Sequence, residues 1–452
     1  MKTKFLLSMC CFAGCLAFLA AEASALEVSD FFLEKPRKKL EEKGITISAL
    51  YTGDMVSNLQ GGLHQKTTYF GDVEIGLEVD LEKAGLIPGG KIYVSGDDTH
   101  GGTLPSRNVG DLQYVDNLEA PDAIRLYEWW YEQSFFKGKL SVLAGAQDVT
   151  GEFAISEYGI LFVNSSFTTP SDLVADTWLS TFPYVGLGTR VKFKPCEQLE
   201  FLAGIYDGDP SDNQKNNHGV SYRLSSRQGL MMLFEGAYHQ NIKFNDTMEP
   251  LKGNIKFGSW LTTQNTDDLL STDGEGSPIR RRNNYGFYGI IDQMLYCEKK
   301  GEGPGAFFGE LLNIRYPSNE ERLEPCGLGV FFQFGGAPSD RNIVNYYFGT
   351  GLTYTGLIPG RRRDVLGVAV ANAFLSKKLR KARDAEIDAF DPAEGPYPGK
   401  LLANESALEM TYRIQLHDNL ALQPDYQIVF HPSGEQNTKT AHVFILRFEV
   451  GF

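Results

Sequence analysis

Apolar and polar side chains alternate at the C-terminal end of the chain. The last ten residues, VFILRFEVGF, carry a bulky apolar residue at every second position, namely Phe444, Leu446, Phe448 and Val450. Charged Arg447 and Glu449 lie between them. A period of two residues is typical of a β-strand whose two faces meet different surroundings. One such strand also suits a soluble β-sandwich, so the rest of the chain has to distinguish the two architectures.

The same alternation recurs in the segment 68–82, TYFGDVEIGLEVDLE. One face of this segment is aromatic or aliphatic, and the other carries four carboxylates, Asp72, Glu74, Glu78 and Asp80. Burying four carboxylates in a dry core would be very costly, so this face must meet water while the other meets apolar surroundings. The segments 407–416 and 420–430 repeat the arrangement.

Sixteen segments carry a strand pattern. They are 46–57, 68–82, 90–97, 123–135, 139–147, 184–194, 199–207, 229–240, 253–262, 284–297, 327–335, 343–354, 364–375, 405–416, 420–430 and 440–452. Bacterial single-chain outer-membrane barrels have an even number of strands, and a tilted strand of about ten residues crosses a bilayer. The pattern therefore predicts an all-β fold, a transmembrane antiparallel β-barrel of about 16 strands.

The connections between these segments are short at one predicted end and long at the other. KAGLIPGG, FKGK, PCEQ, TGLIPGRRR and HDN fall at the first end, and the long segments 98–122, 148–183, 208–228, 263–283 and 376–404 fall at the second. Such asymmetry is typical of periplasmic turns and external loops. The long segment 298–326 and the short GGAPSDRN are exceptions. Either a strand near 306–316 is missed, or 298–326 is a periplasmic insertion.

The first residues predict export. Lys2 and Lys4 precede the apolar run FLLSMCCFAGCLAFLAA, and Ala23-Ser24-Ala25 offers a cleavage site, so we expect residues 1–25 to be a signal peptide. A lipoprotein box at 12–15 is the alternative. Residues 26–45, with Pro36 and Gly44 as helix signals, predict a short N-terminal helical arm in the periplasm. The barrel then covers residues 46–452.

Composition excludes several classes of function. The formal net charge is −14, so no basic face is expected for nucleic acid. Beyond the leader, no stretch approaches the roughly 20 apolar residues of a membrane-spanning helix. The motifs G-x-S-x-G, H-E-x-x-H and the P-loop do not occur, and no metal-ligand spacing stands out. We therefore expect no enzyme, no cofactor and no metal.

The segment 148–183 is the best candidate for a constriction loop folded into the lumen. It mixes aromatic residues with amides and carboxylates, which suit the apolar faces and the hydroxyl groups of a sugar. We expect the polar contacts from Asp148, Asn164 and Asp172, and the apolar contacts from Phe162 and Trp178. An ordinary external loop remains the alternative.

Further pore candidates lie on the predicted wall. In the fourth strand Glu128 and Glu132 share one face, and Arg125, Tyr127, Trp129 and Tyr131 share the other. We favour carboxylates that face the lumen; the assignment inverts if Arg125 faces inward. Alternation also turns Glu409, Arg413, Gln423, Asp425 and Arg447 toward the lumen. An acidic lumen disfavours anions and suits neutral solutes. Mutually paired, solvated wall residues are the alternative.

Three cysteines follow the predicted leader. Cys297 and Cys326 fall at the bases of neighbouring strands, and Cys196 falls in a tight turn at the same end. Because an oxidising periplasm permits disulfides, we predict a Cys297–Cys326 disulfide that leaves Cys196 able to cross-link another protein. Three free thiols are the alternative.

Several segments resemble the carbohydrate-selective porins of the OprB family. They are RLYEWWYEQ (125–133), LFVNSSF (161–167), YDGDP (206–210), NYGFYGIIDQML (284–295), FGGAPSDRN (334–342), GLIPGRRRDVLGVAVA (356–371) and ALQPDYQIVFHPSG (421–434). The resemblance runs in order along about residues 46–452, and only 297–326 and 376–404 depart from it. It implies a sixteen-stranded outer-membrane barrel through which small sugars diffuse into the periplasm.

The expected partners follow from this interpretation. They are small sugars or similar neutral solutes, outer-membrane lipid, and the barrel-assembly machinery, which would bind the C-terminal strand ending at Phe452. A homo-oligomer such as a trimer is left open. The alternatives are an unselective porin, a porin for dicarboxylates, peptides or other solutes, and a plugged structural or adhesive barrel.

Overall fold

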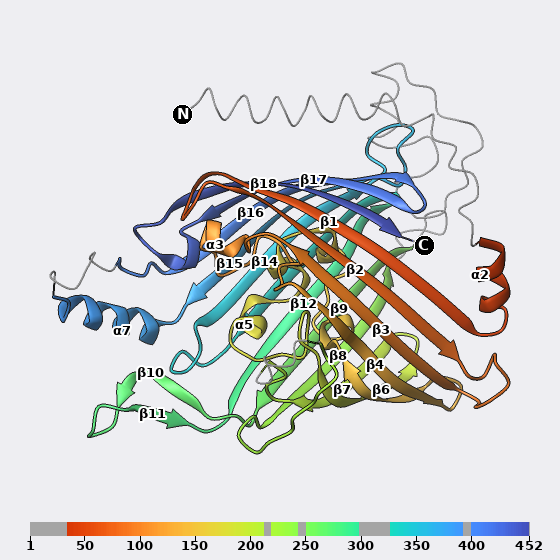
Figure 1. Cartoon of the computed structure of the whole chain (residues 1–452), viewed down its shortest axis with the longest axis horizontal. Coiled ribbons are helices and arrows are strands. Elements are labelled where there is room, and N and C mark those ends of the chain that lie inside the picture. The colour runs from red at the N-terminus through yellow and green to blue at the C-terminus, as the bar shows by residue number, and fades with distance from the viewer. Residues whose placement is uncertain (1–33, 212–217, 243–249, 298–325, 392–398, 452) are drawn as a thin grey trace.

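The computed structural model describes residues 34–211, 218–242, 250–297, 326–391 and 399–451. Sixteen of their strands form one closed antiparallel barrel, in which each strand pairs with its neighbours along the chain and β1 pairs with β18 (Figure 1). The barrel strands are β1 (Ile45–Gly62), β2 (Thr67–Asp80), β3 (Gly90–Gly101), β4 (Ala123–Phe135), β5 (Leu140–Gln147), β6 (Gly186–Cys196), β7 (Leu199–Asp207), β8 (Leu230–Ile242), β9 (Leu251–Thr262), β12 (Asn284–Cys297), β13 (Gly327–Gly336), β14 (Val344–Thr355), β15 (Val365–Leu375), β16 (Asn404–His417), β17 (Leu420–Phe430) and β18 (Lys439–Gly451). The predicted fold class and all sixteen predicted strands are confirmed.

Strand β18 shows why the sequence alternates. Phe444, Leu446 and Phe448 lie on its outer face, where they are partly exposed, while Ile445 and Arg447 point inward and are buried. The apolar face seen in the sequence is therefore the lipid face, as expected where every backbone polar group must be paired within a closed barrel. No helix among the described residues has the length and apolarity to cross a bilayer.

Two of the helices and one hairpin lie outside the barrel wall (Figure 1). Helix α2 (Glu34–Glu41) forms part of the predicted arm and lies at the same end of the barrel as the C-terminal end of β18 (Figure 1). Helix α7 (Lys377–Asp388) and the hairpin β10 (Thr266–Thr272) with β11 (Pro278–Arg281) lie at the opposite end. The sequence reading treated the segments that hold α7 and the hairpin as plain loops.

The exceptional connection between β12 and β13 adds no strand to the barrel. These two strands are hydrogen-bonded neighbours, from Phe287 paired with Gly336 to Cys297 paired with Gly327. The barrel therefore has no place for a further strand between them, which rules out one of the two alternatives, a missed barrel strand near 306–316. The connection itself, 298–325, lies outside the described residues.

Two external loops fill much of the lumen, and the principal buried clusters lie between them and the inner wall. They are loop A (102–122), with α3 (Ser106–Val109), and loop B (148–185), with the short helices η1 (Val149–Gly151), η2 (Gly159–Leu161), α4 (Ser165–Thr168) and α5 (Ser171–Val174). The inner faces of β13–β15 provide the room, because small residues line them, namely Gly335, Gly349, Gly351, Gly367, Ala369 and Ala371. Aromatic residues of loop B occupy that space.

Candidate channel constriction

Loop B begins with a carboxylate that fixes its departure from the wall. The hydroxyl of Tyr127 donates to Asp148, and the backbone N–H of Asp148 donates to Glu128 at 2.8 Å. The Asp148 side chain also accepts the N–H of Thr150 at 2.8 Å and so caps η1. Asp148 is therefore positioned by β4 and holds the first turn of loop B, as an aspartate at such a cap commonly does.

Wall carboxylates then hold the backbone of loop B as it crosses the lumen. Ala154 N–H donates to Glu235 of β8 at 2.8 Å, and Glu157 N–H donates to Asp292 of β12 at 3.1 Å. Farther along, Glu409 of β16 accepts the N–H groups of two consecutive residues of the loop. Each carboxylate satisfies backbone donors that have no strand partner, which fixes an irregular segment inside the barrel.

Loop A is anchored in the same way. Glu405 of β16 accepts the N–H groups of Leu112 at 2.8 Å and Gln113 at 2.7 Å. The Asn164 side chain joins the two loops and the wall, because its amide donates to Gln113 O and to Gln427 Oε1, both at 3.1 Å. The sequence reading predicted the infolding of loop B and missed that of loop A.

A buried ion cluster ties loop A to the seam of the barrel. Arg447 of β18 donates to Asp54 of β1 at 2.9 and 2.7 Å, and it reaches Asp116 at 3.3 Å and Asn117 at 2.7 Å. Burial, together with the nearby Asp54 carboxylate, raises the pKa of Asp116 well above its usual value, although Arg447 opposes the shift. The predicted inward orientation of Arg447 is confirmed, with its guanidinium paired under loop A.

Aromatic packing holds the middle of loop B. The rings of Phe162 and Phe167 lie 5.1 Å apart, and both contact Phe331 of β13. Tyr347 of β14 joins this cluster and donates to the backbone carbonyl of Ser166 at 2.7 Å. Truncating one such buried ring to alanine typically costs about 3–5 kcal/mol. Phe162 is therefore a packing residue of the loop, and its buried ring is not presented to the lumen as the sequence reading expected.

The wall from β2 to β6 keeps a partly exposed, polar inner face. Its side chains include Asp72, Glu74, Tyr93, Glu128, Trp130, Glu132 and Lys192. Two of them form a platform, because the rings of Tyr93 and Trp130 stack 5.2 Å apart at an interplanar angle of 29°. The Tyr93 hydroxyl donates to Glu74 at 3.3 Å. An aromatic surface beside a carboxylate is the chemistry that sugars require.

Cations and carboxylates meet at the edge of this wall. Arg190 donates to Glu132 at 2.9 Å and to Glu152 of loop B at 2.6 Å, and Lys192 donates to Glu152 at 2.9 Å. Burial raises the pKa of Glu152, but the two cations outweigh burial and hold the pKa below its usual value. Both signs of charge are therefore fixed close together.

Strand β4 contains a β-bulge that changes which of its side chains point inward. The register between β3 and β4 shifts between Val94 and Gly96, opposite Tyr127 and Glu128. Arg125 consequently points inward and is buried, with Asp97 at 3.4 Å, yet Glu128 also contacts loop B inside the barrel. Glu128 and Glu132 face inward, as favoured from the sequence, and Arg125 faces inward as well, because the extra residue shifts the inward face by one position between Tyr127 and Glu128.

Several predicted solute contacts are buried beneath the loops. Asn164, Asp172, Glu409 and Asp425 have no exposed surface, and Gln423 has almost none. Gln423 instead donates to the carbonyl of Leu161 at 2.8 Å. Of the other candidates, Arg413 pairs with Glu449 at 2.6 Å and both are partly exposed, while the ring of Trp178 is exposed. Tyr93, Trp130 and Arg190 were not among the predicted site residues, although all three lie within predicted strands.

Asp172 illustrates the cost of this burial. Its carboxylate lies against β13, where a Cβ on Gly335 would come within 2.0 Å of Asp172 Oδ1. Burial raises the pKa of Asp172 to about 7, and neither carboxyl oxygen has a hydrogen-bond partner among the described residues. The side chain is therefore part of the contact between α5 and the wall.

The cysteines lie where the strand pattern placed them. Cys297 ends β12, Cys326 immediately precedes β13, and both side chains are buried. Arg362 donates to the Cys326 sulfur at 3.4 Å. The disulfide between Cys297 and Cys326 stays a prediction. Cys196 has a free, exposed thiol. No cluster of three or more metal-ligating side chains occurs among the described residues.

Comparison with known proteins identifies the family. The model of the carbohydrate-selective porin, OprB family, matches residues 64–452. This chain belongs to the OprB family. It is 21% identical to Porin B of Pseudomonas aeruginosa over 434 residues, which cover 92% of this chain and 89% of that protein. It is 23% identical to the putative porin QuiX of Acinetobacter baylyi over 449 residues, which cover 92% and 91% respectively.

A solved structure shares the fold. The high-pH structure of Pseudomonas putida OprB superimposes with a TM-score of 0.77 at 21% sequence identity, covering 92% of this chain and 96% of that one. Together with the family match, this establishes an outer-membrane porin of the carbohydrate-selective class. Loops A and B are held inside the lumen of this porin.

Proposed function

We propose that this OprB porin passes small neutral sugars, and monosaccharides most readily, by passive diffusion along the β2–β6 side of its lumen. The observation that carries the proposal is the placement of the two loops. Most of their anchors come from β8, β9, β12, β13, β14, β16, β17 and β18. Strands β4 and β6 bind the loops near their ends, at Pro121, Asp148 and Glu152, and part of the β2–β6 inner face stays exposed. A solute that passes the loops therefore meets this face.

The side chains along that face suit an uncharged, hydroxyl-rich solute. The Tyr93–Trp130 platform offers an aromatic surface to the apolar face of a pyranose ring, and Glu74 and Glu128 accept hydrogen bonds from hydroxyl groups. Arg190 and Lys192 balance part of the negative charge, which reduces the attraction for either sign of ion. Diffusion needs no covalent step, so we infer a channel without enzymatic activity.

Planar-bilayer recording of the refolded chain tests the proposal. We expect stepwise conductance that D-glucose and maltose reduce in a concentration-dependent way. In Trp130→Ala the half-blocking sugar concentration should rise about 3- to 10-fold, the equivalent of about 1 kcal/mol of lost stacking. Phe136→Ala is the matched control, because Phe136 is an exposed ring in the turn between β4 and β5, away from the platform and both loops. The half-blocking sugar concentration of this control should equal that of the wild type.

The alternatives give different recordings. Open steps that sugar does not affect would replace the sugar channel with an unselective porin or a porin for another solute. A correctly folded barrel that gives no steps would favour a plugged structural or adhesive protein. Liposome swelling with matched sugar and amino-acid series would then separate solute classes among conducting channels.

The remaining partners are also part of the proposal. An outer groove of β6–β9, lined by Phe193, Phe201, Phe234 and Phe257, supports contact with outer-membrane lipid, because all four rings are exposed. We infer that the final strand is the segment that the barrel-assembly machinery recognises; Phe452 itself lies outside the described residues. Light scattering in detergent would decide between a monomer and a trimer.

A further inference from the structure

A cluster of ion pairs joins three segments at the external end of the barrel, outside the lumen. The segments are the hairpin β10–β11, helix α7 and the turn between β13 and β14 (Figure 1). Asp268 of β10 binds Arg281 of β11 at 2.6 Å and Lys378 of α7 at 3.0 Å. Arg281 also lies 3.6 Å from Asp340 of the turn, which Arg341 binds at 2.8 Å. Three cations therefore share two carboxylates, and the three segments form one surface.

Further cations on these segments are exposed and make no ion pair with another described residue. They are Lys377 and Lys381 of α7 and Arg282, which directly follows β11. The two lysines stand at positions i and i+4 and therefore share one face of the helix. We call these three side chains the basic rim. Within the described part of the chain no carboxylate neutralises them, so they are available to an anion.

The charges of α7 run against the dipole of the helix. Its cations lie in the first two turns, from Lys377 to Arg383, and the carboxylates of Asp384, Glu386 and Asp388 follow. A helix dipole favours the opposite order, with anions at the start and cations at the end. The order therefore does not serve the helix itself. Because α7 directly follows β15, this order places the cations next to the barrel and the carboxylates farther from it (Figure 1).

An aromatic band lies on the outer wall beside the basic rim. Phe287 of β12 and Tyr346 of β14 both pair with Gly336 of β13, and Tyr346 also pairs with Phe374 of β15. The three rings therefore lie in one register row across four neighbouring strands, and all three are exposed on the lipid face. Rows of aromatic residues mark the level of the membrane interface. The basic rim lies only a few residues beyond this row, at the level of lipid headgroups.

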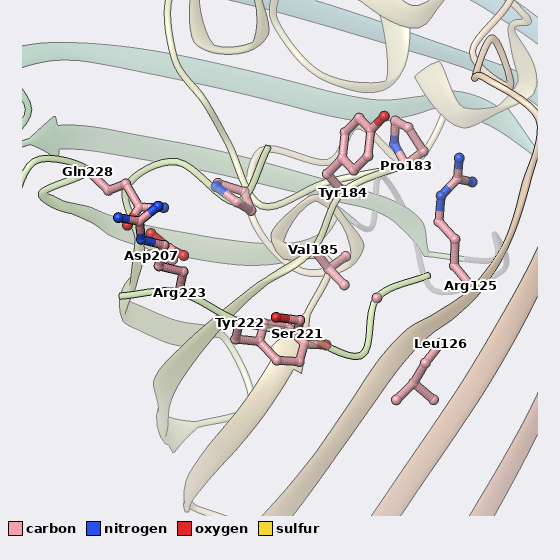
Figure 2. A pocket seen from close by; sticks show the side chains of 12 residues that line it. Arg125, Leu126, Pro183, Tyr184, Val185, Asp207, Ser221, Tyr222, Arg223 and Gln228 are labelled. Atoms are coloured by element: carbon pink, nitrogen blue, oxygen red, sulfur yellow. The ribbon is translucent and has the colours of Figure 1, made fainter. Parts of the chain in front are cut away.

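Other arginines of the external end are placed differently. Arg125 and Arg223 line a small pocket beside the start of β4 (Figure 2). Arg125 is almost completely buried there, with Asp97 at 3.4 Å. These two arginines therefore do not continue the basic rim around the outer wall.

We propose that the basic rim binds the phosphate groups of a phosphorylated glycolipid of the lipid A type in the outer leaflet, and that the acyl chains of this lipid pack on the aromatic band. Lys377, Lys381 and Arg282 donate to the phosphate oxygens, which charge-assisted hydrogen bonds favour. This surface needs only the outer-membrane location established above. Because it lies outside the lumen, the binding does not depend on the solute that the channel passes.

Lipid binding to the detergent-solubilised, refolded full chain tests the site. Diphosphoryl lipid A, dephosphorylated lipid A, phosphatidylglycerol and inorganic phosphate are titrated separately by microscale thermophoresis. The first variant, Lys377→Gln with Lys381→Gln, removes two charges of the basic rim, and Arg282→Gln removes the third. Lys137→Gln with Lys139→Gln is the matched control, because it removes two exposed charges in the turn between β4 and β5, at the other end of the barrel. Single-channel conductance of each variant confirms that the barrel is intact.

Diphosphoryl lipid A should bind the wild type most tightly of the four ligands. The double lysine variant of the basic rim should weaken this binding about 10- to 30-fold and Arg282→Gln about 5-fold, the equivalent of about 1 kcal/mol for each cation near an anionic lipid surface. Dephosphorylated lipid A should bind the wild type and these variants equally. The control variant should bind diphosphoryl lipid A like the wild type, and every variant should keep the wild-type conductance.

Two kinds of result would overturn the site. One is wild-type affinity for diphosphoryl lipid A in both basic-rim variants, or an equal loss in the control variant. The other is phosphatidylglycerol or inorganic phosphate that binds as tightly as diphosphoryl lipid A, because the cations would then accept any anion. Sugar block of conductance is recorded on the same variants, so a failure of the lipid site is distinguished from a failure of the sugar channel.

Discussion

The Glu409 carboxylate on β16 accepts the backbone N–H of Val163, 246 residues earlier in the chain, at 2.7 Å. The same carboxylate accepts the next N–H, that of Asn164, at 3.0 Å. One side chain therefore satisfies two consecutive backbone donors that no strand pairs. This contact therefore fixes the part of loop B that lies farthest from its own strands.

Glu409→Gln should loosen that part of the loop. The glutamine side chain has one acceptor oxygen and brings an NH₂ group toward a backbone donor, so one buried N–H loses its partner, at a cost of about 1–3 kcal/mol. We expect a larger, noisier single-channel conductance and faster swelling of liposomes with longer maltodextrins. Glu78→Gln is the control, because Glu78 faces the lumen from β2 and pairs with Lys91 away from both loops. Equal conductance in the two variants would contradict the anchoring role.

The ion pair between Arg447 and Asp54, at the seam between the first and last strands, leads to a second prediction. They are direct register partners, and Asp116 of loop A shares the same guanidinium. Arg447→Met leaves two buried carboxylates without their cation, which should destabilise the refolded barrel by about 3–5 kcal/mol. Arg413→Met should cost about 1 kcal/mol or less, because its partner Glu449 is partly exposed. Urea unfolding followed by tryptophan fluorescence measures both.

A double variant separates charge burial from lost packing in this cluster. Asp54→Asn removes one of the stranded carboxylates, so Asp54→Asn combined with Arg447→Met should recover part of the loss. A double variant no more stable than Arg447→Met alone would mean that the aliphatic stem of Arg447, and not its charge, carries the effect.

The strands could be predicted from the sequence because lipid imposes one rule on all of them. Outward residues at the level of the lipid must be apolar, so the period of two is unbroken over the outward positions 73–79 of β2, 408–416 of β16 and 444–450 of β18. The predicted ends of β4 at Phe135 and of β12 at Cys297 match the structure. A short turn follows Phe135, and the charged residues EKK follow Cys297 in the sequence, so both ends were easy to place.

The candidate site was harder to predict, because the infolded loops follow the rules of a soluble core. Loop B buries Phe162 and Phe167 on short helical turns of three or four residues, too brief to leave a periodic pattern. Alternation showed correctly that Glu409 and Asp425 face inward, but it gives no information about the loops that bury them. The bulge at Tyr127 and Glu128 could not be predicted, because neither residue is a glycine or a proline.

The buried carboxyl of Asp172 should make the stability of the contact between α5 and the wall depend on pH. In the folded protein the carboxyl keeps its proton up to about pH 7, whereas in the unfolded chain its pKa is the ordinary 3.8. The folded state therefore binds more protons between these values, and its stability falls as the pH rises through this window. The full loss, on the order of 4 kcal/mol, is reached above pH 7.

Asp172→Asn should abolish that dependence, because the amide stays neutral. Its loop B should resist pepsin near pH 4 like the wild type, and should resist chymotrypsin at pH 8 better than the wild type. Asp122→Asn, at the exposed last residue of loop A, is the matched control. A constant difference between Asp172→Asn and the wild type at all pH values would mean that hydrogen bonding, and not ionisation, accounts for it.

Gly367 offers a test of how the wall makes room for loop B. A Cβ at this inward position of β15 would come within 2.7 Å of Leu161 Cδ2 and 2.8 Å of the Phe162 ring. Gly367→Val should therefore displace the aromatic cluster at a cost of about 1–3 kcal/mol and push loop B toward the open side of the lumen. We expect lower conductance and a stronger block by maltose.

Shortening the opposing side chain should reverse the effect. Gly367→Val combined with Phe162→Leu restores the lost space, so its conductance should return toward the wild-type value. Gly236→Ala is the control for an added methyl group on a strand, because its Cβ faces lipid and would lie 3.5 Å from Phe201, an ordinary contact. If Gly367→Val conducts like the wild type, the loop rests on the wall too loosely for the small residues of β13–β15 to set the width of the channel.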